Sequence, residues 1–358
     1  MKLRISALDT LFFRDGKPFD MGDETWADGV FPPYPSVLYG ALRTWYIANH
    51  PDGISQRIID NSADIVITGL HYRLSAGLHL PLPLDLVEPK YKNSEQRNRE
   101  EREELYQVVK LELRQDNSLN NHPLPSLLVP KDQLEVETIE DGLISENEFK
   151  QYLEGALTET GIRRLKHAAQ TEPKVGIGRA DSTNTAQEGK LYRVGMRRAT
   201  NFEMIVEVTL PTDRSQYAAT FIKLGGEGKI AAIEEKGRMD SLKIDQDTIA
   251  LQPGRFKLYL SSPAIFKNGW IPDLESLGVK AELIAAVLGK TVHIGGFDMA
   301  ARKGKGYPKP MLKAVPAGSV YYYESDESVA HILEKLQGKS ISDFLDKQGF
   351  GIAYVGNY

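Results

Sequence analysis

The 358-residue sequence contains no cysteine. Disulfide bridges, iron–sulfur clusters and thiolate-bound metals are therefore excluded. Long apolar runs are also missing, since no stretch approaches the ~18 apolar residues of a membrane-spanning helix. The first ten residues alternate in polarity, and Arg4 and Asp9 interrupt them before the apolar core of a signal peptide can form. We therefore expect a soluble, cytoplasmic protein with no membrane partner.

The common signatures of enzymes are absent as well. Seven histidines are scattered along the chain, and none has the H-x-x-x-H or H-E-x-x-H spacing of a zinc site. Gly304–Gly306 lacks the flanking residues of a phosphate-binding P-loop, and Gly176–Gly178 is followed by polar turn residues rather than by a helix. We therefore predict no metal, no cofactor and no catalytic residue of these classes.

The composition is that of an ordinary globular protein. Apolar residues make up 41% of the chain and charged residues 26%, which is enough apolar material for a core without covalent cross-links. At roughly 100–200 residues per domain, the length predicts about two domains.

Charge is segregated along the chain, although the net charge is −5. Residues 88–159 carry 17 acidic and 9 basic side chains, whereas residues 163–198 carry 9 basic and 3 acidic ones. Residues 297–315 carry five basic side chains and one acid. In the net charge, the acidic stretch outweighs two basic runs, and these runs are candidates for RNA contact. Each run is equally well explained as a solvated surface.

The N-terminal half predicts alternating strands and a helix. A first strand ends near Phe13, and a helix follows a proline-rich loop, with Ser36 as its expected N-cap. Strands are expected at 65–70 and 78–86, where Pro81 and Pro83 indicate an edge position. We interpret residues 88–165 as a charged insertion with a short helix at 104–113.

The second half continues the alternation of strands and helices. We expect strands at 191–194, 202–208, 256–260 and 351–355, and helices at 281–288, 329–336 and 341–346. This order predicts an α+β fold of two tandem ferredoxin-like (RRM-like, βαββαβ) domains with glycine-rich loops, although the pattern alone leaves other α+β arrangements open. The N-terminal domain would span 1–200 and carry the insertion, and the C-terminal domain would span 201–358.

Two glycine-rich segments are candidates for phosphate contact, because a residue without Cβ lets backbone N–H groups approach an anion closely. They are Leu224–Lys229 and Ile294–Asp298, and cations follow the second. Phe297 and Tyr307 are rings on which unpaired bases can stack. The alternative is that the glycines make turns and Phe297 belongs to a core. The candidate residues are Gly225, Gly226, Gly228, Lys229, Gly295, Gly296, Phe297, Arg302, Lys305 and Lys309.

Further cations complete the predicted RNA-binding set. Arg14, Lys17 and Arg43 lie near the start of the first helix, whose N-terminus attracts anions. Arg179 and Arg197 belong to the central basic run. His293 is a conceivable general base for RNA cleavage, but a single histidine beside a glycine turn is usually structural.

Several short segments, taken together, form a recognisable order along the chain. They are Leu11–Phe19, Phe31–Arg43, Gly176–Arg179, Thr185–Tyr192, Leu224–Lys229, Gly295–Asp298, Lys309–Pro310, Ala314–Tyr321 and Gly349–Ala353. In this order they resemble the third Cmr subunit of type III-B CRISPR–Cas effectors, a member of the RAMP superfamily. No single segment is specific, but together they span nearly the whole chain outside 88–165. Phe297 replaces a tryptophan that is expected in many relatives, and the stretch 300–307 is longer than expected.

The resemblance implies two tandem ferredoxin-like folds and a non-catalytic role. It implies that the chain binds the 5′ tag of the crRNA and contacts the large polymerase-like subunit and the adjacent backbone RAMP subunit. Two alternatives stay open: a crRNA-processing endoribonuclease of the same superfamily, and an architectural subunit that binds protein and no RNA. The acidic insertion would then be a surface for protein docking, because its charge repels phosphate.

Overall fold

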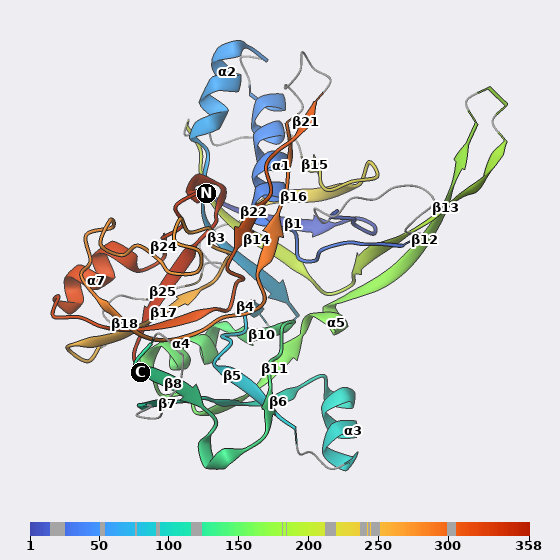
Figure 1. The fold of residues 1–358 in the computed structure, drawn as a ribbon. Helices are drawn as coiled ribbons and strands as arrows, with labels where there is room; N and C mark the ends of the chain where they lie inside the picture. The colour runs from blue at the N-terminus through green and yellow to red at the C-terminus, as the bar shows by residue number, and fades with distance from the viewer. Residues whose placement is uncertain are drawn as a thin grey trace.

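The computed structural model shows a strand-rich mixed α/β protein (Figure 1). Among the residues that the structure describes, no helix is both long and apolar enough to cross a membrane. The described residues are 1–14, 26–50, 54–75, 77–90, 94–115, 124–180, 182–183, 185–211, 220–236, 242, 244, 251–298 and 306–358.

An eleven-stranded sheet forms the larger part of the molecule. It combines strands from the first two-thirds of the chain. In spatial order they are β15 (Phe221–Lys223), β16 (Ile230–Lys236), β1 (Lys2–Ala7), β14 (Glu203–Thr209), β3 (Val66–Leu74), β4 (Gly77–Pro81), β10 (Gly142–Ser145), β11 (Glu159–Arg164), β6 (Tyr106–Lys110), β5 (Leu86–Pro89) and β9 (Val136–Glu137).

Four neighbouring strands of this sheet, β16, β1, β14 and β3, are all antiparallel. Numbered along the chain, they lie in the order fourth, first, third, second. Leu3 and Ile5 alternate with polar residues on β1, and they share a buried cluster with Leu38 and Leu42 of helix α1 (Pro35–Ala48). The boundary predicted at residue 200 falls within this sheet, because β14 and β16 follow it and pair with β1.

A second, five-stranded sheet is built from the C-terminal residues. Its four longer strands, numbered along the chain, lie in the order second, third, first, fourth, which is the order of the first sheet reversed. Helix α7 (Val329–Leu336) buries Ile332 and Leu336 in the large core cluster that the second sheet shares. The strands are β18 (Glu282–Val287), β23 (Val320–Glu324), β17 (Arg255–Leu260), β25 (Ile352–Gly356) and β24 (Lys339–Ser340).

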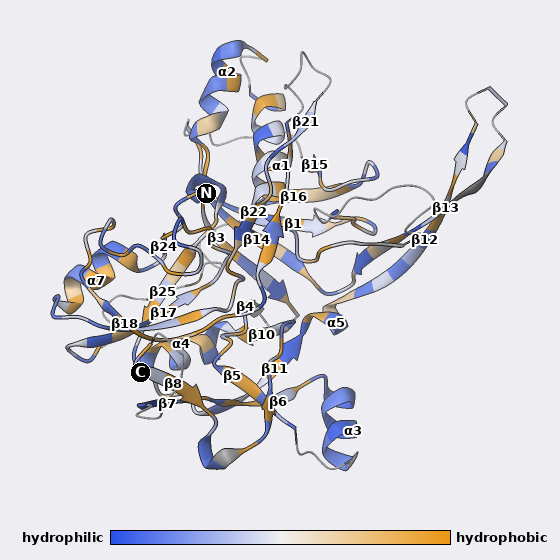
Figure 2. Ribbon diagram, in the orientation of Figure 1, coloured by the Kyte–Doolittle hydropathy of each residue, from blue (hydrophilic) through white to orange (hydrophobic). Residues whose placement is uncertain are grey.

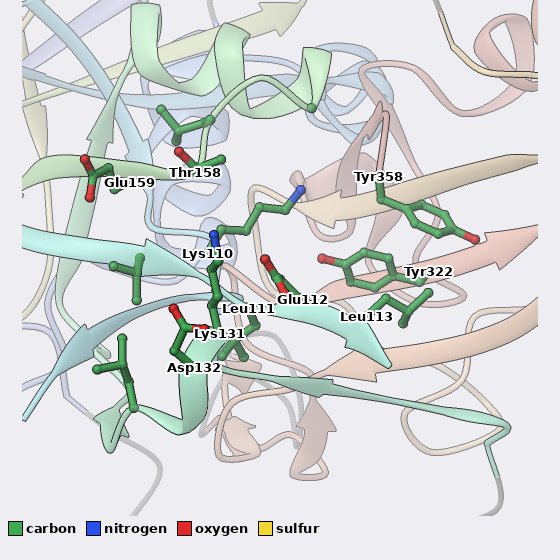
Figure 3. Close-up of a pocket in the computed structure, with 14 residues that line it drawn as sticks. Lys110, Leu111, Glu112, Leu113, Lys131, Asp132, Thr158, Glu159, Tyr322 and Tyr358 are labelled. Atoms are coloured by element: carbon green, nitrogen blue, oxygen red, sulfur yellow. The ribbon is translucent and has the colours of Figure 1, made fainter. Parts of the chain in front are cut away.

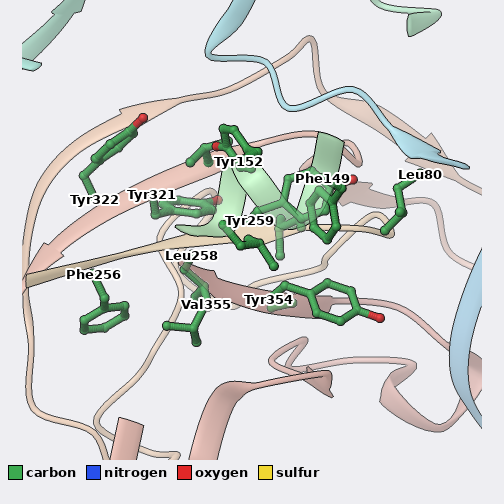
Figure 4. Packing of buried hydrophobic residues seen from close by; sticks show 14 of the residues in the cluster. Leu80, Phe149, Tyr152, Phe256, Leu258, Tyr259, Tyr321, Tyr322, Tyr354 and Val355 are labelled. Carbon is green, nitrogen blue, oxygen red and sulfur yellow. The ribbon is translucent and has the colours of Figure 1, made fainter. Parts of the chain in front are cut away.

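Much of the predicted insertion is part of the core. Helix α4 (Glu146–Glu154) begins at Ser145 with a capping box that Glu148 completes, a standard helix start. Its Phe149 ring lies 4.9 Å from that of Tyr259 and 5.7 Å from that of Tyr354, centroid to centroid. Figure 4 shows these rings packed together. Residues 142–164 therefore join the first sheet to the second.

A buried polar group lies within this junction. The Asp85 carboxylate is fully buried and accepts hydrogen bonds from the Tyr152 and Tyr322 hydroxyls at 2.9 and 2.6 Å. Lys257 Nζ donates to the Tyr152 carbonyl oxygen at 2.7 Å and lies 3.3 Å from the centre of the Tyr152 ring. Burial holds the pKa of Lys257 well below its usual range, and the Asp85 charge opposes that shift.

A cavity of about 610 Å³ adjoins this polar group (Figure 3). Its wall includes cations, tyrosines and carboxylates. Among them are Lys110, Tyr322, Tyr358, Glu112 and Glu159. The mixed charges of its wall point to no single class of ligand.

The remaining elements are small, except for one long hairpin. β13 (Ala186–Ala199) pairs with β12 (Ala169–Arg179) and with β2 (Trp26–Asp28), and the β12–β13 hairpin extends away from the body of the protein (Figure 1). Figure 2 shows that α3 (Ser94–Glu103) is hydrophilic throughout. The other elements are β7 (Glu112–Gln115), β8 (Ser126–Val129), β19 (Val292–Ile294), β20 (Phe297–Asp298), β21 (Tyr307–Pro308), β22 (Leu312–Ala314), α2 (Gln56–Asn61), α5 (Leu165–Ala168), η1 (Ser62–Asp64), η2 (Lys131–Gln133) and η4 (Asp346–Gln348).

Three expected helices are strands or turns instead. Residues 282–287 form strand β18, because pairing with β23 outweighs the helix propensity of their alanines and leucines. Residues 106–110 form β6, in which the buried Tyr106 and Val108 flank the exposed Gln107. The helix expected at 341–346 is also wrong: residues 341–342 are irregular, residues 343–345 form bends, and a short turn of 3₁₀ helix follows at 346–348.

Two local predictions in the N-terminal half are wrong as well. Helix α1 has Tyr34 at its N-cap and Pro35 at its first position, so Ser36 is inside the helix rather than its cap. β4 lies between β3 and β10 and not at an edge, because Pro81 is its last residue and leaves the preceding ladder intact. The strand at 256–260 and the helix at 329–336 are confirmed.

Candidate nucleic-acid interface

The segment Leu11–Phe13 connects three parts of the chain that are far apart in sequence. Leu11 and Arg197 exchange two backbone hydrogen bonds, each of 2.8 Å. The Phe12 carbonyl oxygen accepts from the Gly226 amide at 2.8 Å, and that of Phe13 accepts from the Val30 amide at the same distance. This segment thus places the base of the β12–β13 hairpin beside the first glycine-rich loop.

The glycines of this loop differ in the space around them. Gly225 has a φ of +80°, and a Cβ there would lie 2.4 Å from the Phe12 carbonyl oxygen, so this position admits only glycine. Gly228 also has a positive φ, +66°, but nothing lies within 4 Å of its would-be Cβ. Gly225 is therefore required by packing, whereas the space at Gly228 leaves room for a ligand.

An ion-pair network surrounds the same loop. The Asp9 carboxylate accepts a hydrogen bond from Lys229 Nζ at 2.8 Å and pairs with Arg198 at 3.3 Å. Arg198 also donates to Glu172 at 2.6 Å. The bond from Lys229, with that from the Thr10 backbone, lowers the pKa of Asp9 to about 2. These cations therefore meet protein carboxylates at neutral pH, and a phosphate would have to compete with them.

The β12–β13 hairpin carries two more of the predicted residues. Arg197 donates to the Thr171 hydroxyl across the hairpin, and Arg179 is exposed where β12 ends, opposite Ala186. Lys174 pairs with Glu227 at 3.6 Å and ties the hairpin to the glycine-rich loop. The structure thus brings Arg197 together with Gly225–Lys229, while Arg179 lies farther out along the hairpin.

The second glycine-rich segment lies in a separate arm. The Gly296 carbonyl oxygen accepts from the Lys309 amide at 2.9 Å, and Phe297 pairs with Pro308 across β20–β21. The side chains of Phe297 and Tyr307 are 53% and 47% exposed, as stacking on a base would need. Gly295 lies between β19 and β20 in the same arm. The predicted cations Arg302 and Lys305 lie outside the described residues.

The cations predicted near helix α1 have different surroundings. Arg43 donates from Nε and from one terminal nitrogen to the Ser62 hydroxyl, at 3.1 and 2.9 Å, and its guanidinium lies over the Tyr39 ring. Arg43 therefore joins α1 to η1. Arg14 is exposed and forms a β-bridge with Gly29. Lys17 lies outside the described residues.

His293 lies in β19, opposite Lys313, and its side chain is exposed. In the part of the chain that the structure describes, no hydrogen bond or ion pair is found for its ring. A general base is normally oriented by a second polar group, so this position offers no catalytic arrangement among the described residues.

The carboxylates that oppose these cations could not be predicted from the sequence. Asp9 is 220 residues from Lys229 in sequence and 189 from Arg198. No local pattern connects them, and only the folding of Leu11–Phe13 onto the hairpin brings them together. The hairpin had only a partial sequence signal: residues 191–194 were expected as a strand, whereas β12 contains Pro173, Gly176 and Gly178, which are poor strand formers.

Comparison with known proteins identifies the class of the chain. A family model described as CRISPR-associated protein (Cas_Cmr3) matches residues 3–358. Because this match covers the chain nearly from end to end, the chain belongs to that family of CRISPR-associated proteins. The resemblance to the third Cmr subunit of type III-B effectors is thereby confirmed. No curated protein matches the sequence.

Solved structures of effector complexes are similar at low identity. Two are described as cryo-EM structures of the Type III-B Cmr-beta bound to cognate target RNA, the second also with AMPPnP. In both, the matched chain shares 18% identity with this chain, and the match covers 90% of this chain and 86% of the matched one. The TM-scores are 0.48 and 0.49. The third is a crystal structure of a Csm3–Csm4 subcomplex of the type III-A interference complex, with 14% identity over 91% and 94% of the two chains and a TM-score of 0.36. At these scores the similarity carries no argument about ligands.

Proposed function

We propose that the chain is a non-catalytic subunit of a type III-B CRISPR effector that binds the 5′ tag of the crRNA and docks on the large polymerase-like subunit and the adjacent backbone RAMP subunit. Membership of the Cas_Cmr3 family supports the assignment to the effector. Such a role serves antiviral defence through RNA-guided recognition of RNA.

We also propose that each sheet contains one ferredoxin-like unit. The antiparallel orders β16-β1-β14-β3 and β25-β17-β23-β18 are those of the four strands of a βαββαβ unit. The first unit retains its first helix, α1, and the second retains its second helix, α7. A sheet of this kind presents a regular framework from which hairpins and loops can reach RNA.

The observation that supports RNA binding most directly is the pair of exposed rings in the β20–β21 arm. A Cβ on Gly306 would lie 2.2 Å from the Phe297 ring, so the absence of a side chain at Gly306 lets this ring lie against the backbone. The Lys309 side chain lies against Gly296, the residue before Phe297. A ring, a cation and bare backbone together suit an unpaired nucleotide.

The test is the affinity of the full chain for single-stranded RNA at several salt concentrations. Five phosphate contacts would give a slope of log affinity against log salt near −3.5, at about 0.7 per contact. Phe297→Ala should weaken binding roughly 5- to 150-fold if one base stacks there, corresponding to about 1–3 kcal/mol. Phe344→Ala, at another exposed phenylalanine, is the matched control. Salt-independent binding, or equal effects of the two variants, would contradict RNA binding at this arm.

Docking of protein subunits is proposed for the acidic region at 88–165. Deletion is unsuitable as a test, because residues 142–164 belong to the first sheet and the core. Charge reversal at the exposed Glu95 and Glu135 should weaken capture of the large subunit, whereas reversal at the exposed Glu275 should not. Unchanged capture by the first variant would contradict an acidic docking surface.

The endoribonuclease alternative makes a separate prediction about His293. If the chain processed repeat RNA, the isolated protein would cleave it and His293→Ala would abolish cleavage. The proposed function predicts intact RNA with both proteins.

A further inference from the structure

The glycine-rich loop Leu224–Lys229 is the turn of a β-hairpin that β15 and β16 form at the edge of the eleven-stranded sheet. One face of this hairpin packs on helix α1, since Ile222 and Ala231 are buried in the cluster that also contains residues of α1. Figure 1 shows the hairpin beside α1, and the ion pair between Lys174 and Glu227 connects its turn to the β12–β13 hairpin. The opposite face of β15–β16 is therefore its outer face.

The outer face carries a ring, a cation and an aliphatic side chain next to one another. Lys223 lies directly opposite Ile230 in the ladder, and residues paired in this way share a face. Phe221 precedes Lys223 by two residues on β15, so its ring is on the same face. Phe221 and Ile230 are 56% and 49% exposed. The ring is thus open to a stacking partner, and a cation lies beside it.

Lys223 differs from the cations of the Asp9 network. Lys229 and Arg198 both pair with the Asp9 carboxylate, whereas for the exposed Lys223 no hydrogen bond or ion pair is found among the described residues. The carboxylate that β16 places on the outer face, Glu234, pairs with Arg4 at 2.7 Å. Within the described structure, a phosphate at Lys223 therefore has no carboxylate to displace.

The turn of the hairpin adds backbone donors. Glu227 and Gly228 have φ values of +57° and +66°, and the Lys229 amide donates to the Gly226 carbonyl oxygen at 3.3 Å, as in a two-residue type I′ turn. The two central amides of such a turn point away from the ladder, and neither has a hydrogen-bond partner among the described residues. Since nothing lies within 4 Å of the would-be Cβ of Gly228, an anion can approach these amides.

We propose that the outer face of the β15–β16 hairpin binds single-stranded RNA, with one unpaired base stacked on Phe221, its phosphate at Lys223 and the next phosphate at the turn. The inference rests on the proposed function and extends it to residues outside the glycine-rich loop. Phe221 and Lys223 are about 6.7 Å apart along the strand, a separation similar to that between the base and the phosphate of one nucleotide. Because the turn follows Lys223 directly, all three contacts lie on one hairpin.

The test measures binding of the full chain to a uridine-rich single-stranded RNA across a salt series. Phe221→Leu keeps an apolar side chain but removes the ring, so it should weaken binding at least about fivefold, whereas Phe221→Trp should retain binding. Lys223→Gln should make the slope of log affinity against log salt shallower by about 0.7. Phe344→Leu and Lys267→Gln, at exposed positions of the C-terminal part, are the matched controls and should change neither quantity.

The outcomes separate this inference from the proposed function. If the wild-type chain binds RNA with a salt-dependent affinity that Phe221→Leu and Lys223→Gln leave unchanged, the inference is overturned and the proposed function stands. If the wild-type chain shows no salt-dependent RNA binding, the inference and the proposed RNA-binding function both fail. If Phe221→Leu retains RNA affinity while Phe221→Asp releases the chain from the other effector subunits, the face binds protein and the inference is overturned as well.

Discussion

The backbone amide of Gly226 donates a hydrogen bond of 2.8 Å to the carbonyl oxygen of Phe12, 214 residues earlier in the chain. This bond fixes the first glycine-rich loop against the segment that also pairs with the base of the long hairpin. Two of the sequence segments that resemble the Cmr family therefore meet in space. Within the glycine-rich loop, Gly225 is required for packing against Phe12, whereas Gly228 has open space around it and is free to serve ligand binding.

Gly225→Ala should destabilise the protein by about 2–4 kcal/mol, because alanine would adopt a left-handed conformation and collide with the Phe12 carbonyl oxygen. Gly228→Ala should cost about 1–2 kcal/mol, since only the conformational penalty applies there. Chemical denaturation of both variants measures the difference. Equal losses would mean that the close approach to Phe12 is not a constraint.

Asp9→Asn should strengthen RNA binding. The substitution removes the carboxylate that pairs with Lys229 and Arg198. Lys229 then becomes available to phosphate, whereas Arg198 keeps its bond to Glu172. The slope of log affinity against log salt should steepen by about 0.7, the value of one contact. Asp343→Asn, which removes a carboxylate paired with Lys267 elsewhere, is the control. Weaker binding of Asp9→Asn would show that the network builds the interface rather than competing with RNA.

Tyr322→Phe should lower the free energy of unfolding by about 1–3 kcal/mol, because the buried Asp85 carboxylate would lose one of its hydroxyl donors. Tyr358→Phe removes a longer hydrogen bond, 3.2 Å to the Tyr323 carbonyl oxygen, from a half-buried position, and should cost less. Thermal and urea unfolding compare the two variants. A neutral Tyr322→Phe would mean that Asp85 is satisfied without this hydroxyl.

Stability should fall as the pH drops from about 6.5 to about 4, partly because of His71. This ring is fully buried, and burial lowers its pKa from 6.5 to about 4. Over that interval the unfolded chain takes up a proton at this histidine and the folded chain does not, so unfolding becomes more favourable by about 3 kcal/mol. The variant His71→Asn should lack this part of the pH dependence, while His293→Asn, at an exposed histidine, should retain it.

Much of the architecture could be predicted from the sequence because local signals agree with the tertiary fold. The periodicity of Val329–Leu336 specified helix α7, and the alternation of Phe202–Val208 specified strand β14. Ala281–Leu288 failed because its residues favour a helix in isolation, and pairing with β23 decides otherwise. The position of residues 142–164 in the core could not be predicted, because the segment is rich in charged residues and contains only a few buried rings, such as Phe149.

The candidate interface could be predicted less completely. The glycine-rich segments and the ring at Phe297 could be proposed as candidates, because glycine and aromatic residues carry a local chemical signal, and their contact with RNA stays a prediction. Arg43, whose contact with RNA stays a prediction, donates to the Ser62 hydroxyl, a relationship that no sequence spacing reveals. The opposing carboxylates, above all Asp9, were missed because ion pairs across roughly 200 residues depend on the tertiary fold alone.

The most direct test of RNA-tag binding is photo-crosslinking in the assembled effector complex, with photoreactive nucleotides in the 5′ tag of the guide RNA. The proposal predicts crosslinks to this chain at residues 225–229 and 295–309, and their loss at the second site in Phe297→Ala. Crosslinks confined to the neighbouring subunits would contradict the proposal and leave the chain an architectural subunit.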